Sequence, residues 1–144
     1  MKELIKDIAA VLRKADREDK IPTIRLNGTS DIPWERVMFE GKNIFSYFPE
    51  TQFYDYTKRP DRKNLPDNYH LTFSLSEDND EFAKQMMSQG MGVAAVFREL
   101  PETLWGYPVF DGDETDLRFL DPPGHIIGLK AKGSARHDTS GFVR

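Results

Sequence analysis

Apolar and polar positions alternate with helical spacing at the start of the chain. The apolar residues Leu4, Ile5, Ile8, Ala9, Val11 and Leu12 recur at intervals of three and four. Charged residues fall mostly between them, as in an amphipathic helix with one face against a core. The pattern therefore predicts a helix over residues 2–15. The charged run 13–20 that follows is typical of a solvated helix end and loop.

Further along, the pattern changes to that of strands. Residues 52–57 and 69–76 alternate in polarity and are rich in aromatic or β-branched residues. The run 92–97 is continuously apolar, as in a strand buried on both faces. Two shorter apolar segments, 23–26 and 125–129, are further strand candidates.

Three more helical segments are expected between these strands. One opens at Pro33, one covers residues 44–48 and is ended by Pro49, and one follows the acidic run 77–80 and stops at Gly90. The alternation of helices and strands favours an α/β fold with a mostly parallel sheet. We expect a partial (β/α) barrel or a three-layer α/β domain.

Domain organisation follows from the same elements. We expect a single α/β domain over residues 1–144, with an N-terminal helix and charged loop at 1–20 and a core at 21–129. Residues 130–144 are predicted to form an irregular polar tail. An exposed edge of a parallel sheet usually needs cover, so a homodimer is also expected.

Composition narrows the class of protein. With 144 residues, 38% hydrophobic and 31% charged, the chain resembles a soluble domain, and its net charge of −4 argues against coating DNA. The absence of cysteine excludes disulfides, thiolate zinc sites and a cysteine-held iron–sulfur cluster in this chain. No segment reaches the roughly 20 apolar residues of a membrane span, and no signal peptide is evident. We therefore expect a cytoplasmic protein that contacts no membrane.

Candidate chemistry gathers where predicted strands end. The cluster Asn27-Gly28-Thr29-Ser30-Asp31 follows the first strand, a position where α/β proteins bind ligands. The same rule applied to the other strands gives a candidate ligand-binding set: Asn27, Thr29, Ser30, Asp31, Thr57, Lys58, Arg59, Ser74, Ser76, Arg98, Lys130 and Lys132. Hydroxyls, amides and cations together suit a phosphate or carboxylate group, as on a nucleotide. The alternative is that these are ordinary polar loop residues.

Catalytic roles within this set are hypotheses. Asp31 is the candidate general base, and Lys58 or Arg98 the cation that would hold an anion. The sequence fits an enzyme and a non-catalytic binder alike.

Two other constellations have simpler explanations. Tyr54 and Tyr56 precede a basic loop that contains Lys58, Arg59, Arg62 and Lys63, a combination found in single-strand nucleic-acid binders. The alternative is a packed strand edge and a solvated loop. The acidic segment 111–121 suits a solvated turn better than a magnesium or calcium site. No metal site is assigned.

Several segments together resemble a known family. They are Arg25-Leu26-Asn27-Gly28-Thr29-Ser30-Asp31, Phe53-Tyr54-Asp55-Tyr56-Thr57-Lys58, Tyr69-His70-Leu71-Thr72-Phe73-Ser74 and Phe119-Leu120-Asp121-Pro122. Over roughly residues 22–143 the chain is similar to the bacteriophage family labelled gene product eighty-eight-like. The resemblance implies a phage or prophage setting, and either a truncated barrel of the radical S-adenosylmethionine type or a three-layer α/β domain.

The same resemblance limits the chemistry. Longer relatives carry a cysteine-containing N-terminal portion, whereas this chain has no cysteine. Iron–sulfur and radical chemistry are therefore not carried over, and the cofactor stays unknown. The family's activity is itself unassigned, so the resemblance supplies no catalytic residues.

Three functions remain as hypotheses. The first is a phage accessory protein that binds a nucleotide or another phosphate or carboxylate ligand. The second is an interaction protein that docks onto a host protein through an exposed aromatic patch of Trp34, Phe39, Tyr47 or Trp105. The third is a single-stranded nucleic-acid binder.

Overall fold

The computed structural model describes residues 1–144 and has an α/β fold with seven strands and three α-helices. The strands follow the order β1-β2-β3-β4-β7-β6-β5, so the sheet is open and does not close into a barrel. The pairs β1–β2, β3–β4, β4–β7 and β6–β7 are parallel, and β5–β6 is antiparallel. The predicted fold class, α/β with a mostly parallel sheet, is confirmed.

The chain divides into two compact units. The first comprises residues 1–55 and 62–70, and the second comprises residues 56–61 and 71–144. Strands β2 and β3 each contribute residues to both units. The expectation of a single domain stays a prediction.

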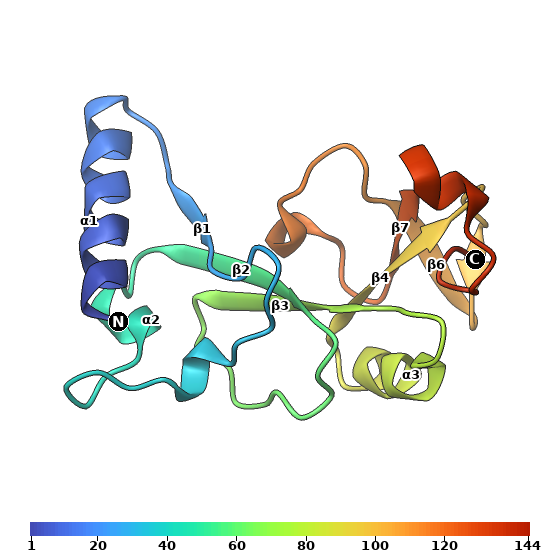
Figure 1. Cartoon of the computed structure of the whole chain (residues 1–144), viewed down its shortest axis with the longest axis horizontal. Helices are drawn as coiled ribbons and strands as arrows, with labels where there is room; N and C mark the ends of the chain where they lie inside the picture. Colours follow the sequence, from blue (N-terminus) through green and yellow to red (C-terminus); the bar gives the residue numbers. More distant parts are fainter. The chain divides into compact units, whose positions relative to one another are not determined.

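The first unit begins with the long helix α1, Lys2–Arg17, drawn in blue in Figure 1. The helix is amphipathic as predicted, and Ile8 and Ala15 are buried. An acidic residue in the first turn and basic residues in the last turn complement the helix dipole. The predicted N-terminal helix is therefore confirmed and extends two residues further.

The rest of the first unit consists of short strands and helical turns that surround a core of aromatic side chains. Strand β1, Thr23–Arg25, pairs with β2, Gln52–Thr57, and helix α2 covers Ile44–Tyr47. The helix expected at Pro33 is only a single 3-10 turn, Trp34–Arg36.

Three aromatic rings make the centre of this unit. The ring of Phe45 stacks on Tyr69 at 4.2 Å between centroids and meets Phe53 edge-on at 5.0 Å. Such ring pairs add stability beyond their buried area.

The second unit is built on β3, Tyr69–Ser74, helix α3, Asp80–Ser88, and β4, Gly92–Phe97. Buried apolar side chains form its core. They come from β3 and the residue that follows it, from α3, from β4 and from β7: Phe73, Leu75, Ala83, Met86, Met87, Val93, Ala95, Phe97 and Ile126. Phe82, an apolar residue near the start of α3, lies outside this core and is 49% exposed.

A short hairpin follows in the second unit. Strands β5, Thr103–Leu104, and β6, Tyr107–Asp111, are joined by Trp105 and Gly106, whose φ values are 52° and 82°. Two positive φ values in a two-residue loop match the twist of a tight hairpin. The unit then passes through a 3-10 turn, Arg118–Leu120, into β7, Ile126–Lys130.

The C-terminal segment differs from the irregular tail predicted for residues 130–144. It contains a 3-10 helix, Gly133–His137, and then returns to the sheet, where Val143 pairs with Val96 in parallel and is only 3% exposed. Backbone hydrogen bonds of Arg144 to Val96 at 2.8 Å and from Arg98 at 3.0 Å hold the end of the chain beside β4, and the predicted domain bounds stay a prediction.

No helix of this chain has both the length and the apolar character needed to cross a membrane.

Candidate functional site

In the first unit, the loop after β1 is shaped by the buried side chain of Asn27, which is 2% exposed. Its Oδ1 accepts hydrogen bonds from Ser30 Oγ at 3.0 Å, Trp34 Nε1 at 3.0 Å and the backbone of Ile32 at 3.4 Å. Its Nδ2 donates to the carbonyl of Ile32 at 3.1 Å. Asn27 therefore holds the loop from inside, while Thr29 and Ser30 lie exposed at its surface.

Asp55 lies beneath this loop and is fully buried. Its carboxylate accepts from the backbone N–H of Asn27 at 2.8 Å, from Asn27 Nδ2 at 3.3 Å and from Tyr69 Oη at 2.7 Å. Burial raises the pKa of Asp55, and the hydrogen bonds from Tyr69 and Asn27 act against that rise. Asp55 thus joins β2 to the loop after β1.

Arg62 completes this network. Its side chain is 0% exposed, and it forms a two-pronged ion pair with Glu35, with Nε–Oε1 at 3.0 Å and Nη2–Oε2 at 2.6 Å. Nη1 lies 3.2 Å from Asp31 Oδ1, and Nη2 also donates to Tyr69 Oη at 3.0 Å. Burial tends to lower the pKa of Arg62, but its bonds to Glu35 and Tyr69 outweigh burial and raise it.

This placement corrects the sequence interpretation of Arg62. A residue in a loop of charged residues and prolines was expected to be solvated, and in the nucleic-acid hypothesis to face phosphates. The guanidinium is instead enclosed by carboxylates of its own unit, so it is not available to an external phosphate. Tyr54 and Tyr56 are half-buried, and the rest of that hypothesis stays a prediction.

Asp31, the candidate general base, belongs to the edge of the same network. Its side chain is 29% exposed, and Oδ1 is held by Arg62. It is the member of the network with carboxylate surface open to solvent, since Glu35 has a side chain only 5% exposed. Its catalytic role stays a prediction.

The carboxyl ends of β3 and β4 lie in the second unit. Asn79 joins the end of β3 to the start of α3, because Nδ2 donates to the carbonyl of Ser74 at 3.1 Å and Oδ1 accepts from the N–H of Ser76 at 2.7 Å. Ser76 Oγ donates to Asp78 at 3.1 Å. Arg144 donates to the carbonyl of Ser76 at 2.6 Å and forms an ion pair with Asp80. The end of the chain therefore sits on the end of β3.

Two of the predicted cations meet at the same C-terminal segment. Arg98, directly after β4, donates to the carbonyls of Asp138 and Val143. Lys58 lies over the ring of Phe142, with Nζ 5.6 Å from its centroid. The structure thus brings Lys58 and Arg98 to adjacent residues, although they are far apart in sequence.

The other predicted residues of the second unit have partners inside the chain. Thr57 is buried, and its Oγ1 accepts from the N–H of Arg59 at 3.0 Å. Arg59 pairs with Asp61 at 3.2 Å. At the end of β7, Lys132 pairs with Asp113 at 3.4 Å, and the backbone of Lys130 donates to the same carboxylate at 3.0 Å.

The acidic segment is therefore partly occupied by its own chain. Asp113 binds the end of β7, and Asp121 Oδ2 lies 3.4 Å from Nε of the fully buried Arg118. Burial raises the pKa of Asp121, and the charge of Arg118 acts against that rise. The described residues contain no group of three or more His, Cys, Asp or Glu placed to hold a metal ion.

Sequence reasoning missed Asp55, Arg62 and Tyr69 as a connected network. A signal was present for Asp55, because the alternation of 52–57 places it on the same face as Phe53 and Thr57, which are both buried. A carboxylate on a buried face needs partners. Nothing in the sequence indicated that Arg62 would belong to the same network.

The fold and these sites define an α/β protein with an open, mostly parallel sheet and a buried polar network below its first strand-end loop. The model of the family described as Gene product 88 matches residues 1–144, so the chain belongs to this phage protein family. The family match gives no support for a barrel of the radical S-adenosylmethionine type. No curated protein and no solved structure matches the chain.

Proposed function

We propose that this protein is a phage accessory protein that binds a phosphate- or carboxylate-bearing ligand, with nucleotides as the first class to test. The proposed site is the C-terminal edge of the second unit, at the ends of β2 and β4. The observation that carries the proposal is that Lys58 and Arg98 contact adjacent residues, Phe142 and Val143.

The charge of Arg98 supports this site. Its hydrogen-bond partners are two backbone carbonyls, those of Asp138 and Val143, and no acidic side chain pairs with it. Carbonyls orient the guanidinium and leave its positive charge uncompensated. An oriented guanidinium at a strand end suits the planar oxygens of a phosphate or carboxylate.

Phe142 adds a second feature that suits a nucleotide. Its ring is half-buried beside Lys58, and an aromatic ring next to a cation can contact both a base and a phosphate. The proposal concerns binding alone.

The test is calorimetric titration of the purified chain with ATP, GTP and citrate. We expect one of these ligands to bind the unmodified chain, and Lys58→Gln and Arg98→Gln each to weaken that binding about tenfold or more, because each removes a charged hydrogen bond. The matched control is Lys84→Gln, an exposed cation of the same unit on α3, which should bind as the unmodified chain does. The proposal would be overturned if none of the three ligands bound, or if Lys58→Gln and Arg98→Gln both bound the ligand as tightly as the unmodified chain.

The docking hypothesis has less support in the structure. None of the four aromatic residues named for an exposed patch is exposed: Trp34, Phe39, Tyr47 and Trp105 are all half-buried. Tyr47 donates to the carbonyl of Phe39 at 2.9 Å, and Trp105 lies under Lys84. The expected host partner and the homodimer stay predictions.

A further inference from the structure

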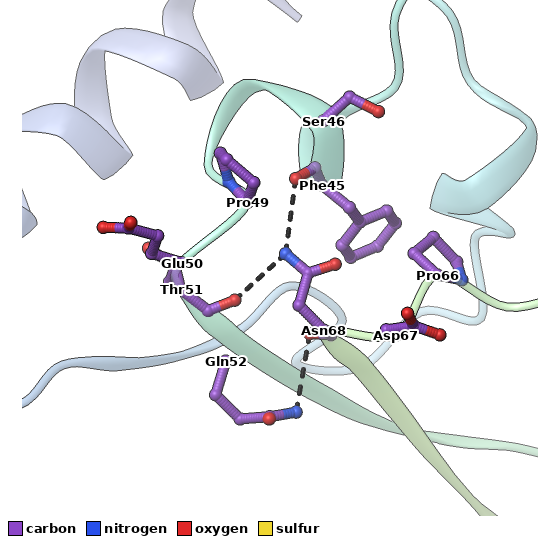
Figure 2. A pocket seen from close by; sticks show the side chains of 9 residues that line it. All are labelled: Phe45, Ser46, Pro49, Glu50, Thr51, Gln52, Pro66, Asp67 and Asn68. Carbon is purple, nitrogen blue, oxygen red and sulfur yellow. Dashed lines mark hydrogen bonds between the residues drawn. The ribbon is translucent and has the colours of Figure 1, made fainter.

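The first unit contains a solvent-open pocket of about 540 Å³ between helix α2 and the residues that precede β3. Figure 2 shows it from close by, with the turn after α2 on one side and residues 66–68 on the other. Its volume falls within the range of about 300–1,000 Å³ that is usual for small-molecule sites. It involves none of the residues of the site proposed in the second unit.

The wall of the pocket is fixed by the side chain of Asn68. Its Nδ2 donates to the carbonyls of Phe45 at 3.3 Å, Phe48 at 3.0 Å and Thr51 at 3.1 Å. Figure 2 shows the bonds to Phe45 and Thr51. Three carbonyls around one nitrogen settle the orientation of the amide and leave Oδ1 without a donor from the chain.

Gln52 repeats this arrangement. Its Nε2 donates to the carbonyls of Phe53 at 2.9 Å and Asn68 at 3.4 Å, so its oxygen is also left as an acceptor. Both amides in the pocket have thus used their N–H groups on the chain's own carbonyls. Their side-chain oxygens are therefore the atoms available to accept a hydrogen bond from a ligand.

The charged groups of the pocket have the same character. Glu50 and Asp67 are exposed carboxylates without an ion pair, and no Lys, Arg or His lines the pocket. Thr51 also lines the pocket, and its hydroxyl has no partner in the chain. That hydroxyl is not one of the enclosed polar atoms that lack a partner, so it is open to solvent and to a ligand.

We propose that this pocket binds an organic cation through its guanidinium or primary ammonium group. Such a group carries several N–H donors and a positive charge, which complement a pocket whose free polar atoms are carboxylate, amide and hydroxyl oxygens. Pro49 and Pro66 supply apolar surface for the carbon chain that bears the cation. A guanidinium suits the site especially, because its planar donors can reach several acceptors at once.

The test uses L-argininamide as the probe and citrullinamide as its neutral analogue of similar shape. We expect argininamide to shift the backbone amide NMR signals of residues around the pocket, and citrullinamide to leave them in place. The double variant Glu50→Gln with Asp67→Asn should weaken argininamide binding about tenfold or more. Both positions are exposed, so the variant should keep its fold and its melting temperature.

The matched control is Asp7→Asn, which removes an exposed carboxylate of the same unit on α1 and should leave the affinity unchanged. A second comparison identifies the source of the cation. Tighter binding of an acetyl-Gly-Arg-Gly-amide peptide than of agmatine would point to an arginine of a partner protein, and the reverse to a free small amine.

Three results would overturn the inference. They are no binding of argininamide to the unmodified chain, equal binding by the double variant, and equal binding of citrullinamide. Because Lys58→Gln and Arg98→Gln leave this pocket intact, the failure of either proposal is separable from the failure of the other.

Discussion

Tyr69 Oη donates a 2.7 Å hydrogen bond to Asp55 Oδ2, and the same hydroxyl accepts from Arg62 Nη2 at 3.0 Å. One phenol thus links a buried carboxylate to a buried guanidinium. Burial is the largest cause of the raised pKa of Tyr69, and its bond to Asp55 adds to that rise. The hydroxyl therefore keeps its proton and acts as a donor to Asp55.

Removing this hydroxyl should destabilise the first unit. In Tyr69→Phe the ring can still stack on Phe45, but Asp55 loses a donor and Arg62 an acceptor. We expect a loss of about 1–3 kcal/mol in the free energy of unfolding, as for other buried polar groups left unpaired. Urea unfolding measures it. The control Tyr107→Phe removes a hydroxyl with no bond in the chain and should change stability by less than about 0.5 kcal/mol; equal losses would contradict the prediction.

Arg62 should be the most sensitive position of the network. Arg62→Met removes the guanidinium that pairs with Glu35 and Asp31, and breaking a buried ion pair on one side typically costs about 3–5 kcal/mol. The control is Arg59→Met. The side chains of Arg59 and Asp61 are 38% and 54% exposed, so their ion pair should contribute less than about 1 kcal/mol to stability. Adding Glu35→Gln to Arg62→Met should restore part of the loss, because one unpaired charge is removed. Equal unfolding midpoints for Arg62→Met and Arg59→Met would contradict this prediction.

The stability of the network should depend on acid pH through Glu35. Burial raises the pKa of Glu35, but the hydrogen bond and charge of Arg62 outweigh it and hold the pKa below its usual value of 4.5. The unfolded chain therefore binds the proton more readily, and the stabilisation is present above pH 4.5 and lost as pH falls through the lower folded-state pKa.

Glu35→Gln tests this dependence, because glutamine does not titrate. We expect the difference in unfolding free energy between the unmodified chain and the variant to be largest near neutral pH and to shrink below pH 4.5. Urea unfolding at a series of pH values gives that difference directly. A difference that grows on acidification would mean that the sign of the Glu35 shift is wrong.

Much of the fold could be predicted because its longer elements carry clear periodicity. The alternation of 52–57 and the apolar run 92–97 predicted β2 and β4 with the bounds that the structure has. Strand β5 has two residues, too few for any period to show. The return of Val143 to the sheet was missed because it depends on one side chain and on contacts distant in sequence.

The sites were less predictable for a related reason. The strand-end rule found the loop at Asn27 and the cations Lys58 and Arg98, since it depends only on where strands stop. The rule could not show that the side chain of Asn27 would be buried. Nor could it show that the side chain of Arg62 would be buried and pair with Glu35, 27 residues earlier. Ion pairs between distant segments have no spacing rule in the sequence.

Gly112 should tolerate no side chain, because it lies against the buried Arg118 in the second unit. A Cβ at Gly112 would lie 2.3 Å from Arg118 Nη1 and 2.5 Å from Ile127 Cγ2, while Arg118 Nη2 donates to the carbonyl of Gly112 at 2.8 Å. Alanine would push the guanidinium away from its carbonyl and from Asp121. Overpacking of this kind costs about 1–3 kcal/mol.

Gly92→Ala is the matched control for Gly112→Ala. Gly92 lies in the same unit, has no positive φ, and has no atom within 4 Å of the added Cβ. We expect its stability to be unchanged or to rise by up to about 1 kcal/mol, because alanine reduces the freedom of the unfolded chain. Thermal and urea unfolding of the two variants give the comparison. If Gly112→Ala were as stable as Gly92→Ala, the close packing of Arg118 against Gly112 would be refuted.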